Sequence, residues 1–201
     1  AAGLSPSMHA IGDEAARLAL DAIDASDSIG GPAARIEHAQ TLAPDDLLRF
    51  RGQFASMQPL HKAYDARSAV GRLGPRRMDR FFPFRRLLDA GARLAFGSDW
   101  PIVSPDPMLG IAAAVTGLDV DGAPCRIEDS IGVHEALVAY TRTAAECLGL
   151  DAGVIAEGRL ADCTLLDADP YACDWVTRRP RAIGTIMGGR VTFAEDRSPF
   201  A

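Results

Sequence analysis

The sequence predicts an α/β fold that holds about half of a (β/α)8 TIM barrel, followed by a small β-structure. Short apolar segments ending near residues 9, 38, 57 and 97 alternate with stretches of helical spacing. The mean separation of the segment ends is about 30 residues, close to one βα unit of a barrel that needs roughly 250 residues for eight units. Residues 1–148 therefore hold about four units, and the chain begins where a fifth strand belongs.

The predicted barrel elements follow in chain order. Leu18, Ala19 and Ala22 recur at helical spacing behind a Gly12-Asp13 turn, and they predict the first helix. Gly30-Gly31-Pro32 breaks the chain before the second strand. The polar stretch 61–80 shows no clear period, so we expect a loop with a role there. The predicted strands are residues 4–10, 34–38, 54–57 and 93–97, and further helices are expected from about Pro44, over 84–90 and over 135–148.

The chain changes character after Gly149. Residues 160–167 and 185–193 are β-rich, and the second segment carries a Gly188-Gly189 hairpin signal. We therefore divide the chain into a partial barrel, 1–148, and a C-terminal β-segment, 149–201. The expected core positions of this segment are Leu165, Leu166, Ile186, Val191 and Phe193.

The composition is that of an ordinary globular protein, 48% hydrophobic and 24% charged. The net charge of −6 argues against a nucleic-acid or membrane-surface partner. No apolar run approaches the roughly 18–20 residues of a membrane span, and the first seven residues lack the features of a secretion signal. The four cysteines form no CxxC pair, so free thiols are favoured over a zinc knuckle or disulfides, and a reducing cytoplasm is the expected location.

Three potential metal ligands, His9, His38 and Asp99, fall at predicted strand ends. Active sites of (β/α)8 enzymes lie at the carboxyl ends of the strands, where such side chains converge. Imidazole and carboxylate groups are suitable ligands for zinc and related divalent ions. Each residue also has a structural interpretation: a hydrogen-bonded histidine at a strand end, or an aspartate that caps a turn. Glu37 is expected on the opposite strand face from His38, as a structural charge partner.

The residues around these positions resemble the amidohydrolase superfamily, in particular the subgroup that includes N-substituted formamide deformylase. The matches run in order along almost the whole chain. They are HAIGDEA (9–15), RIEHAQ (35–40), SMQPLH (56–61), LLDAGARLAFGSDWPIVSPDPMLGI (87–111), and the closing EGRLADCTLLDADP and IGTIMGGRVTF.

The resemblance implies a (β/α)8 barrel with a composite β-sandwich, of which this chain supplies the equivalents of strands five to eight and the C-terminal part of the sandwich. It implies His9 as the fifth-strand ligand, His38 as the sixth and Asp99 as the eighth, for one or two divalent ions, with zinc expected. The sequence departs from the full pattern because the His-x-His pair of the first strand and the fourth-strand residue are absent.

The implied reaction is hydrolysis of an amide, formamide or cyclic amide. A divalent ion lowers the pKa of bound water from 15.7 to about 7 and polarises the carbonyl under attack. Asp99 is then the expected proton acceptor and donor to the departing amine. Gln58 and His61 are expected polar contacts of the substrate pocket, and Trp100 is expected as an apolar wall of that pocket or as ordinary packing.

Two alternatives remain open at this stage. The chain is either part of an active hydrolase of small amide-type molecules, or a non-catalytic fragment or half-barrel that needs a partner chain. A phosphoester hydrolase of related barrel type is disfavoured by the HAIGD and GSDWP contexts. Because four parallel strands leave two free edges and an inner face expected to be apolar, we expect the missing half or a homo-oligomer to cover them.

Overall fold

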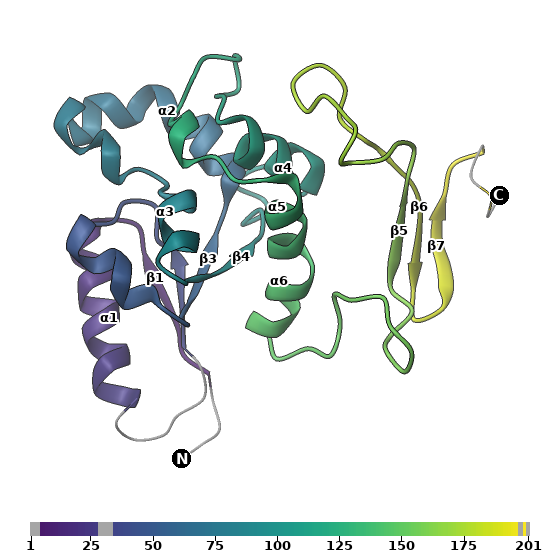
Figure 1. Cartoon of the computed structure of the whole chain (residues 1–201), viewed down its shortest axis with the longest axis horizontal. Coiled ribbons are helices and arrows are strands. Elements are labelled where there is room, and N and C mark those ends of the chain that lie inside the picture. The colour runs from purple at the N-terminus through teal and green to yellow at the C-terminus, as the bar shows by residue number, and fades with distance from the viewer. Residues whose placement is uncertain (1–4, 28–33, 197–198, 200–201) are drawn as a thin grey trace.

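A parallel sheet of four strands lies among the helices of the N-terminal part of the chain (Figure 1). The computed structural model describes residues 5–27, 34–196 and 199. The strands lie in the order β1-β2-β3-β4, with bounds Ser7–Ala10, Arg35–His38, Phe54–Met57 and Arg93–Phe96. All four predicted strands are present. The predicted start at Leu4 and the Gly30-Gly31-Pro32 break lie outside the described residues.

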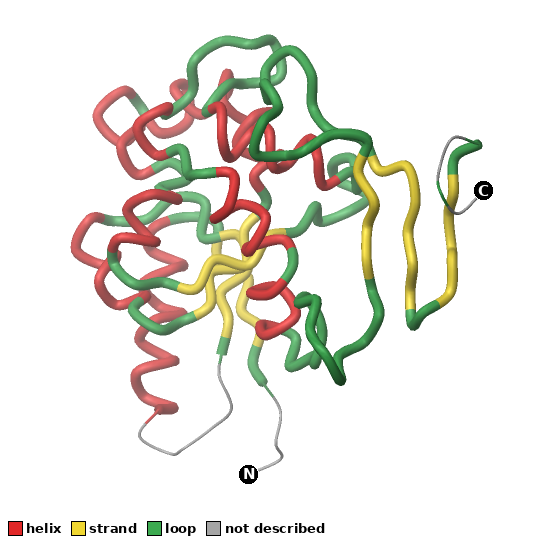
Figure 2. The backbone as a smooth tube through the Cα atoms, turned by 45° about the vertical axis from the view of Figure 1, so that its right-hand side comes forward, coloured by secondary structure: helices red, strands yellow, loops and turns green. Residues whose placement is uncertain are grey.

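Helices connect the strands and cover one face of the sheet (Figures 1 and 2). The α-helices are α1 (Asp13–Asp27), α2 (Pro59–Leu73), α3 (Phe84–Asp89), α4 (Pro107–Thr116), α5 (Val133–Tyr140) and α6 (Arg142–Cys147). The 3₁₀ helices are η1 (Pro44–Phe50), η2 (Pro75–Arg80) and η3 (Ile127–Asp129). Within the described ranges, none of these helices has the length and apolarity that a bilayer crossing requires.

The sequence pattern accounts for α1 but not for α4. In α1 the residues at helical spacing, Ala16, Ala19, Leu20 and Ile23, are buried, and the helix packs against β1. Helix α4 was not predicted, because its central residues, Gly110 to Ala114, are all buried and a helix that is apolar all round shows no amphipathic period.

Three predicted segments differ from the structure. Residues 61–80 are not a loop, since most of them belong to α2 and η2. The helix expected from Pro44 is the 3₁₀ helix η1. The single helix expected over 135–148 is broken at Thr141, whose ψ of −89° is outside the helical range, so α5 and α6 are separate helices.

The two faces of the parallel sheet carry different side chains. Facing the helices are buried apolar residues: Ile36, Ala55, Met57, Leu94 and Phe96. On the other face, strand alternation and register align mostly polar residues: Ser7 and His9 on β1, Arg35 and Glu37 on β2, Ser56 on β3 and Arg93 on β4, with the buried apolar Phe54 and Ala95 among them. The inner face is therefore more polar than the sequence predicted.

A second sheet, antiparallel and three-stranded, lies apart from the first (Figure 1, right). It consists of β5 (Cys163–Leu166), β6 (Ala182–Met187) and β7 (Arg190–Ala194), and the predicted Gly188-Gly189 turn joins its last two strands. None of its expected core residues is buried: Val191 is 50% and Phe193 44% exposed. The contact with the rest of the chain comes from the β5–β6 connection, where Trp175 joins the main core and Tyr171 hydrogen-bonds His134.

Candidate metal and active site

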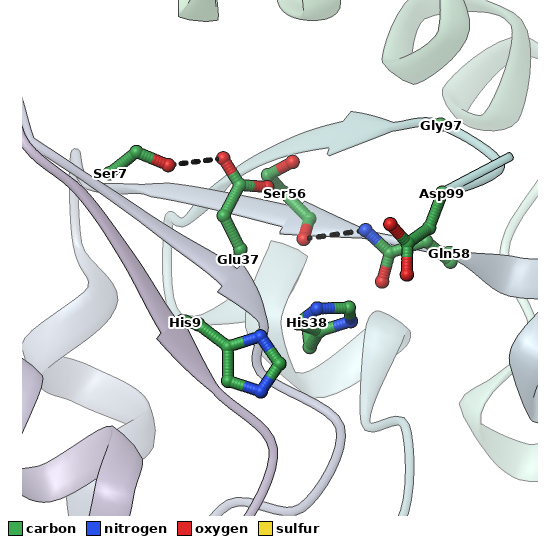
Figure 3. Close-up of a pocket in the computed structure, with 8 residues that line it drawn as sticks. All are labelled: Ser7, His9, Glu37, His38, Ser56, Gln58, Gly97 and Asp99. Atoms are coloured by element: carbon green, nitrogen blue, oxygen red, sulfur yellow. Dashed lines mark hydrogen bonds between the residues drawn. The ribbon is translucent and has the colours of Figure 1, made fainter. Parts of the chain in front are cut away.

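A pocket of about 340 Å³ lies over the polar face and the carboxyl ends of the parallel strands (Figure 3). Each of the four strands, or the residues just after it, contributes to this pocket. The lining residues are Ser7, His9, Glu37, His38, Ser56, Gln58, Gly97 and Asp99. This is the end of a parallel α/β sheet at which ligands bind.

His38 reaches the pocket because the backbone turns at the end of β2. Strict alternation would place His38 on the face of Ile36, away from Glu37. At His38 and Ala39 the backbone adopts φ values of 76° and 45°, in the left-handed region. This turn brings the imidazole round the strand end, so that His38 and Glu37 line the same pocket.

Asp99 lies in a tight turn that follows β4. Its φ is 56°, its carbonyl accepts a hydrogen bond from the amide of Ile102 at 3.0 Å, and the amide of Trp100 donates to Ser98 Oγ at 3.3 Å. The Asp99 side chain is 43% exposed and lines the pocket, whereas Trp100 is 69% exposed and is not among the lining residues. The turn therefore holds the carboxylate, but not the indole, at the pocket.

His61, predicted as a pocket contact, is not among the residues that line the pocket but lies in a cluster with His38 and Asp99. Among the described residues, potential ligand atoms of His38, His61 and Asp99 all lie within 4.8 Å of one another. His61 Nε2 is 4.0 Å from Asp99 Oδ2, and the His61 ring stacks on that of His38 at a centroid distance of 6.0 Å. The SMQPLH segment was the only signal for this residue, and spacing alone did not indicate that it joins the ligands.

His9 and Gln58 border the cluster without belonging to it. His9 is exposed, and its ring meets that of His38 edge-on at a centroid distance of 4.4 Å. Gln58 is buried, its amide nitrogen donates to the Ser56 carbonyl at 3.4 Å, and its Oε1 has no hydrogen-bond partner. Both residues line the pocket.

Two imidazole nitrogens of the cluster are buried and could bind a ligand. Nδ1 of His38 and Nε2 of His61 are buried without a hydrogen-bond partner, a costly arrangement unless something else binds them. Burial lowers the pKa of His38, the imidazoles of His9 and His61 lower it further, and the Asp99 carboxylate and the nearby Gln58 side chain oppose them. A neutral imidazole is the form that coordinates a metal, so these residues fit a divalent ion.

Glu37, expected on the opposite face, lines the same pocket. Its Oε1 accepts hydrogen bonds from Ser7 Oγ at 2.6 Å and from Arg35 Nε at 2.5 Å (Figure 3 shows the first). Burial opposes ionisation of this carboxyl, but the hydrogen bonds from Ser56, Ser7 and Arg35 outweigh it and hold the pKa below the ordinary value of 4.5. The predicted charge partner is thus present, inside the pocket.

Replacement of Glu37 by Gln should destabilise the fold at neutral pH and flatten its acid response. A lowered folded-state pKa means that the ionised carboxylate stabilises the fold above about pH 4.5 and that this contribution is lost as pH falls through the folded-state value. We expect about 1.5–3 kcal/mol less unfolding free energy at pH 7, the range for hydrogen bonds to a charged group. Urea denaturation from pH 7 to pH 3 measures both effects. An unchanged pH slope in Glu37→Gln, beside the exposed control Glu157→Gln, would contradict this assignment.

Comparison with known proteins now adds to this geometry. A family model described as "Amidohydrolase family" matches residues 1–193. The chain is 37% identical over 198 residues to Protein LONG AFTER FAR-RED 3 of Arabidopsis thaliana, covering 94% of this chain and 34% of that protein. It is 34% identical over 96 residues to N-substituted formamide deformylase of Arthrobacter pascens, covering 47% of this chain and 18% of that protein.

A solved structure gives the same picture. The crystal structure of a metal-dependent hydrolase from Pyrococcus horikoshii OT3 superposes with a TM-score of 0.76 at 32% sequence identity. The superposition covers 88% of this chain and 36% of that one. The chain therefore spans about a third of the length of the relatives that it matches from end to end.

Proposed function

The chain belongs to the amidohydrolase family, and from this membership we propose that it is part of a metal-dependent hydrolase of C–N bonds in amides, formamides or cyclic amides. We also propose that β1 to β4 correspond to strands five to eight of a (β/α)8 barrel, and that 149–201 belongs to a β-sandwich. The parallel order of the strands and the likeness to the Pyrococcus horikoshii hydrolase support this arrangement.

One observation carries the metal-dependent chemistry. The buried, unpartnered Nδ1 of His38 lies beside the carboxylate of Asp99, at the carboxyl ends of parallel strands. Imidazole nitrogen with carboxylate oxygen is a donor set suited to zinc. His38 and Asp99 are the ligands in this proposal, and His9, on the other side of His38, is available for a second ion.

A bound divalent ion would make a water more acidic and polarise the carbonyl under attack. Asp99 has the position for the proton transfers, since its carboxylate is at the pocket and partly open to solvent. It accepts a proton from the attacking water and delivers it to the departing nitrogen. The free Oε1 of the buried Gln58 amide can accept a hydrogen bond from a substrate N–H.

The pocket and one relative support the substrate class. A volume of about 340 Å³ suits a small molecule rather than a polymer. The Arthrobacter pascens relative is named for its action on N-substituted formamides. Formamides and small cyclic amides are therefore the first compounds to test.

The test is hydrolysis by the protein expressed from its complete reading frame. We expect turnover of at least one N-substituted formamide, amide or cyclic amide, loss of turnover on dialysis against a chelator, and recovery on addition of Zn²⁺. Phosphate esters serve as the comparison substrates. Turnover that survives removal of metal would refute the proposal, as would turnover of the phosphate esters alone.

A second candidate is a chain that has no activity without a partner half. The observation that favours it is that β1 and β4 each pair on one side only within the described residues. In that case residues 1–201 alone should give no turnover in the same assay, and mixing with the remaining part of a barrel should restore it. Chelator-sensitive turnover by residues 1–201 alone would exclude this candidate.

A further inference from the structure

We propose that Gln58 makes this site selective for compounds that carry a hydrogen on the nitrogen of the scissile bond, because its side-chain oxygen accepts that N–H. The inference rests on the proposed hydrolysis of C–N bonds and narrows its substrate class. The class is formamides and amides with one substituent on nitrogen, and cyclic amides with a free N–H. Water adds to the carbonyl carbon, the C–N bond breaks and the nitrogen takes up a proton, which gives a carboxylic acid and a primary amine.

Gln58 lies at the junction of β3 and α2, where helix capping does not explain it. It directly precedes Pro59, the first residue of α2, but within the described residues its side chain makes no capping hydrogen bond. The first turn is closed by main-chain groups instead, since the amide of His61 donates to the Gln58 carbonyl at 3.0 Å. Serine, threonine, aspartate and asparagine are the side chains that cap helices. The glutamine side chain lines the pocket instead.

The contact with Ser56 decides which end of the Gln58 amide is without a partner. Nε2 donates to the Ser56 carbonyl at 3.4 Å (Figure 3). A carbonyl oxygen can only accept, so the opposite orientation of the amide would bring two acceptors together. The atom without a partner is therefore the oxygen, Oε1, and it is buried. A substrate that meets Gln58 in this pocket meets an acceptor and has to supply a donor.

The burial of Oε1 makes a missing donor costly. Gln58 is 5% exposed, and a buried acceptor that has lost water without gaining a donor is unfavourable. The hydrogen bond to Ser56 is long and the last torsion of a glutamine side chain is soft, so a small turn of the amide brings Oε1 to an N–H in the pocket. A compound with a methyl group on the nitrogen fills the same space and leaves Oε1 unpaired.

Gln58 lies beside the proposed ion site, so the N–H that it meets is that of the bond under attack. It lines the same pocket as Asp99 and His38, and its side chain raises the pKa of the His38 imidazole. The serine hydroxyls at the pocket are hydrogen-bonded to Glu37. In the proposed site Nδ1 of His38 binds the ion and has no proton to donate. The substrate therefore provides the donor.

The experiment compares compounds that differ only by a methyl group on the nitrogen, with the protein expressed from its complete reading frame. The pairs are N-butylformamide and N-butyl-N-methylformamide, the two corresponding acetamides, and γ-butyrolactam and its N-methyl derivative. In the unaltered protein we expect kcat/KM to be about 10–100-fold higher for the N–H member of each pair that is hydrolysed.

Two variants remove the acceptor and one variant is the control. Gln58→Met, which is similar in length but has only a weak acceptor, should lower this ratio by about 10–100-fold, and Gln58→Leu should do the same. Because the same two compounds are compared in each protein, their intrinsic reactivities cancel. Gln53→Met is the matched control, since Gln53 precedes β3 at the opposite end of that strand, and its ratio should stay within about twofold. Circular dichroism checks the fold of each variant.

The outcomes separate this inference from the proposed function. Similar rates for the two members of a pair in the unaltered protein would overturn the inference and leave the proposed function standing, and this comparison needs no variant. An unchanged ratio in the folded Gln58 variants would overturn it as well. Equal losses for both members, together with a Zn²⁺ affinity reduced about 10–100-fold in calorimetry, would mean that Gln58 acts by orienting His38 and not on the substrate. Failure of the unaltered protein to hydrolyse any of these compounds would remove the proposed function and the inference with it.

Discussion

Replacement of Asp99 by Asn should lower kcat of the complete protein by about 10²–10⁴, the contribution of a positioned general base. Asparagine keeps the size of the side chain and tolerates the left-handed backbone at this position, where φ is 56°. It removes the anionic ligand and the proton acceptor together. Steady-state kinetics with a formamide or amide that the unaltered protein hydrolyses measures the effect, and circular dichroism shows whether the fold is retained.

Asp106→Asn is the matched control for this change. Asp106 lies in the same segment after β4, and its side chain caps α4 by accepting a hydrogen bond from the amide of Met108 at 2.9 Å. Asparagine also caps a helix, so kcat should change little. If Asp99→Asn retains more than about a tenth of the rate, Asp99 is not the proton carrier.

Replacement of Asp129 by Ala should lower the unfolding free energy by about 3–5 kcal/mol, the cost of breaking a buried ion pair by removal of one partner. Asp129 is 1% exposed, accepts a hydrogen bond from Arg86 Nε at 2.9 Å, and accepts another from Arg126 Nη2 at 2.6 Å. The carbonyl of Arg126 in turn anchors Lys62. The same carboxylate therefore stabilises the fold and supports the start of α2.

Chemical denaturation measures this effect, with Asp89→Ala as the control. Asp89 also pairs with an arginine, Arg85, at 3.0 Å, but its side chain is 64% exposed. Exposed pairs contribute about 0–1 kcal/mol, so this variant should unfold close to the unaltered protein. An equal loss of unfolding free energy in the two variants would contradict the stabilising role of the buried Asp129 ion pairs.

The four strands could be predicted because each is a short apolar run with a polar end, separated from the next by residues of helical spacing or turn-forming residues. Helix α2 could not be predicted for a specific reason. Two polar residues, His61 and Lys62, lie on the buried side of the helix with Leu60, Ala63 and Ala66. Because polar residues are expected to be exposed, the sequence of this segment shows no apolar face at helical spacing. The burial of these two residues depends on partners from elsewhere in the chain, such as the Arg126 carbonyl.

The candidate site was predictable in part. His38 and Asp99 were identified from strand-end positions and flanking motifs, and the structure places both at the pocket. Alternation alone put Glu37 and His38 on opposite faces, which was wrong because the backbone turns at His38. The placement of His61 beside them depends on how α2 follows β3, a three-dimensional relation that residue spacing does not encode.

The left-handed backbone at His38 and Asp99 also limits what evolution can place there. Asn, Asp and His adopt this conformation several times more readily than other residues with a side chain, and β-branched residues are strained in it. A descendant of this chain that had lost its chemistry would still be under selection to keep such residues, because its turns require them. Retention of Asp or Asn at position 99 in a distant homologue therefore reports on the shape of the loop, and it bears on the proposed metal centre only where His38 is retained as well.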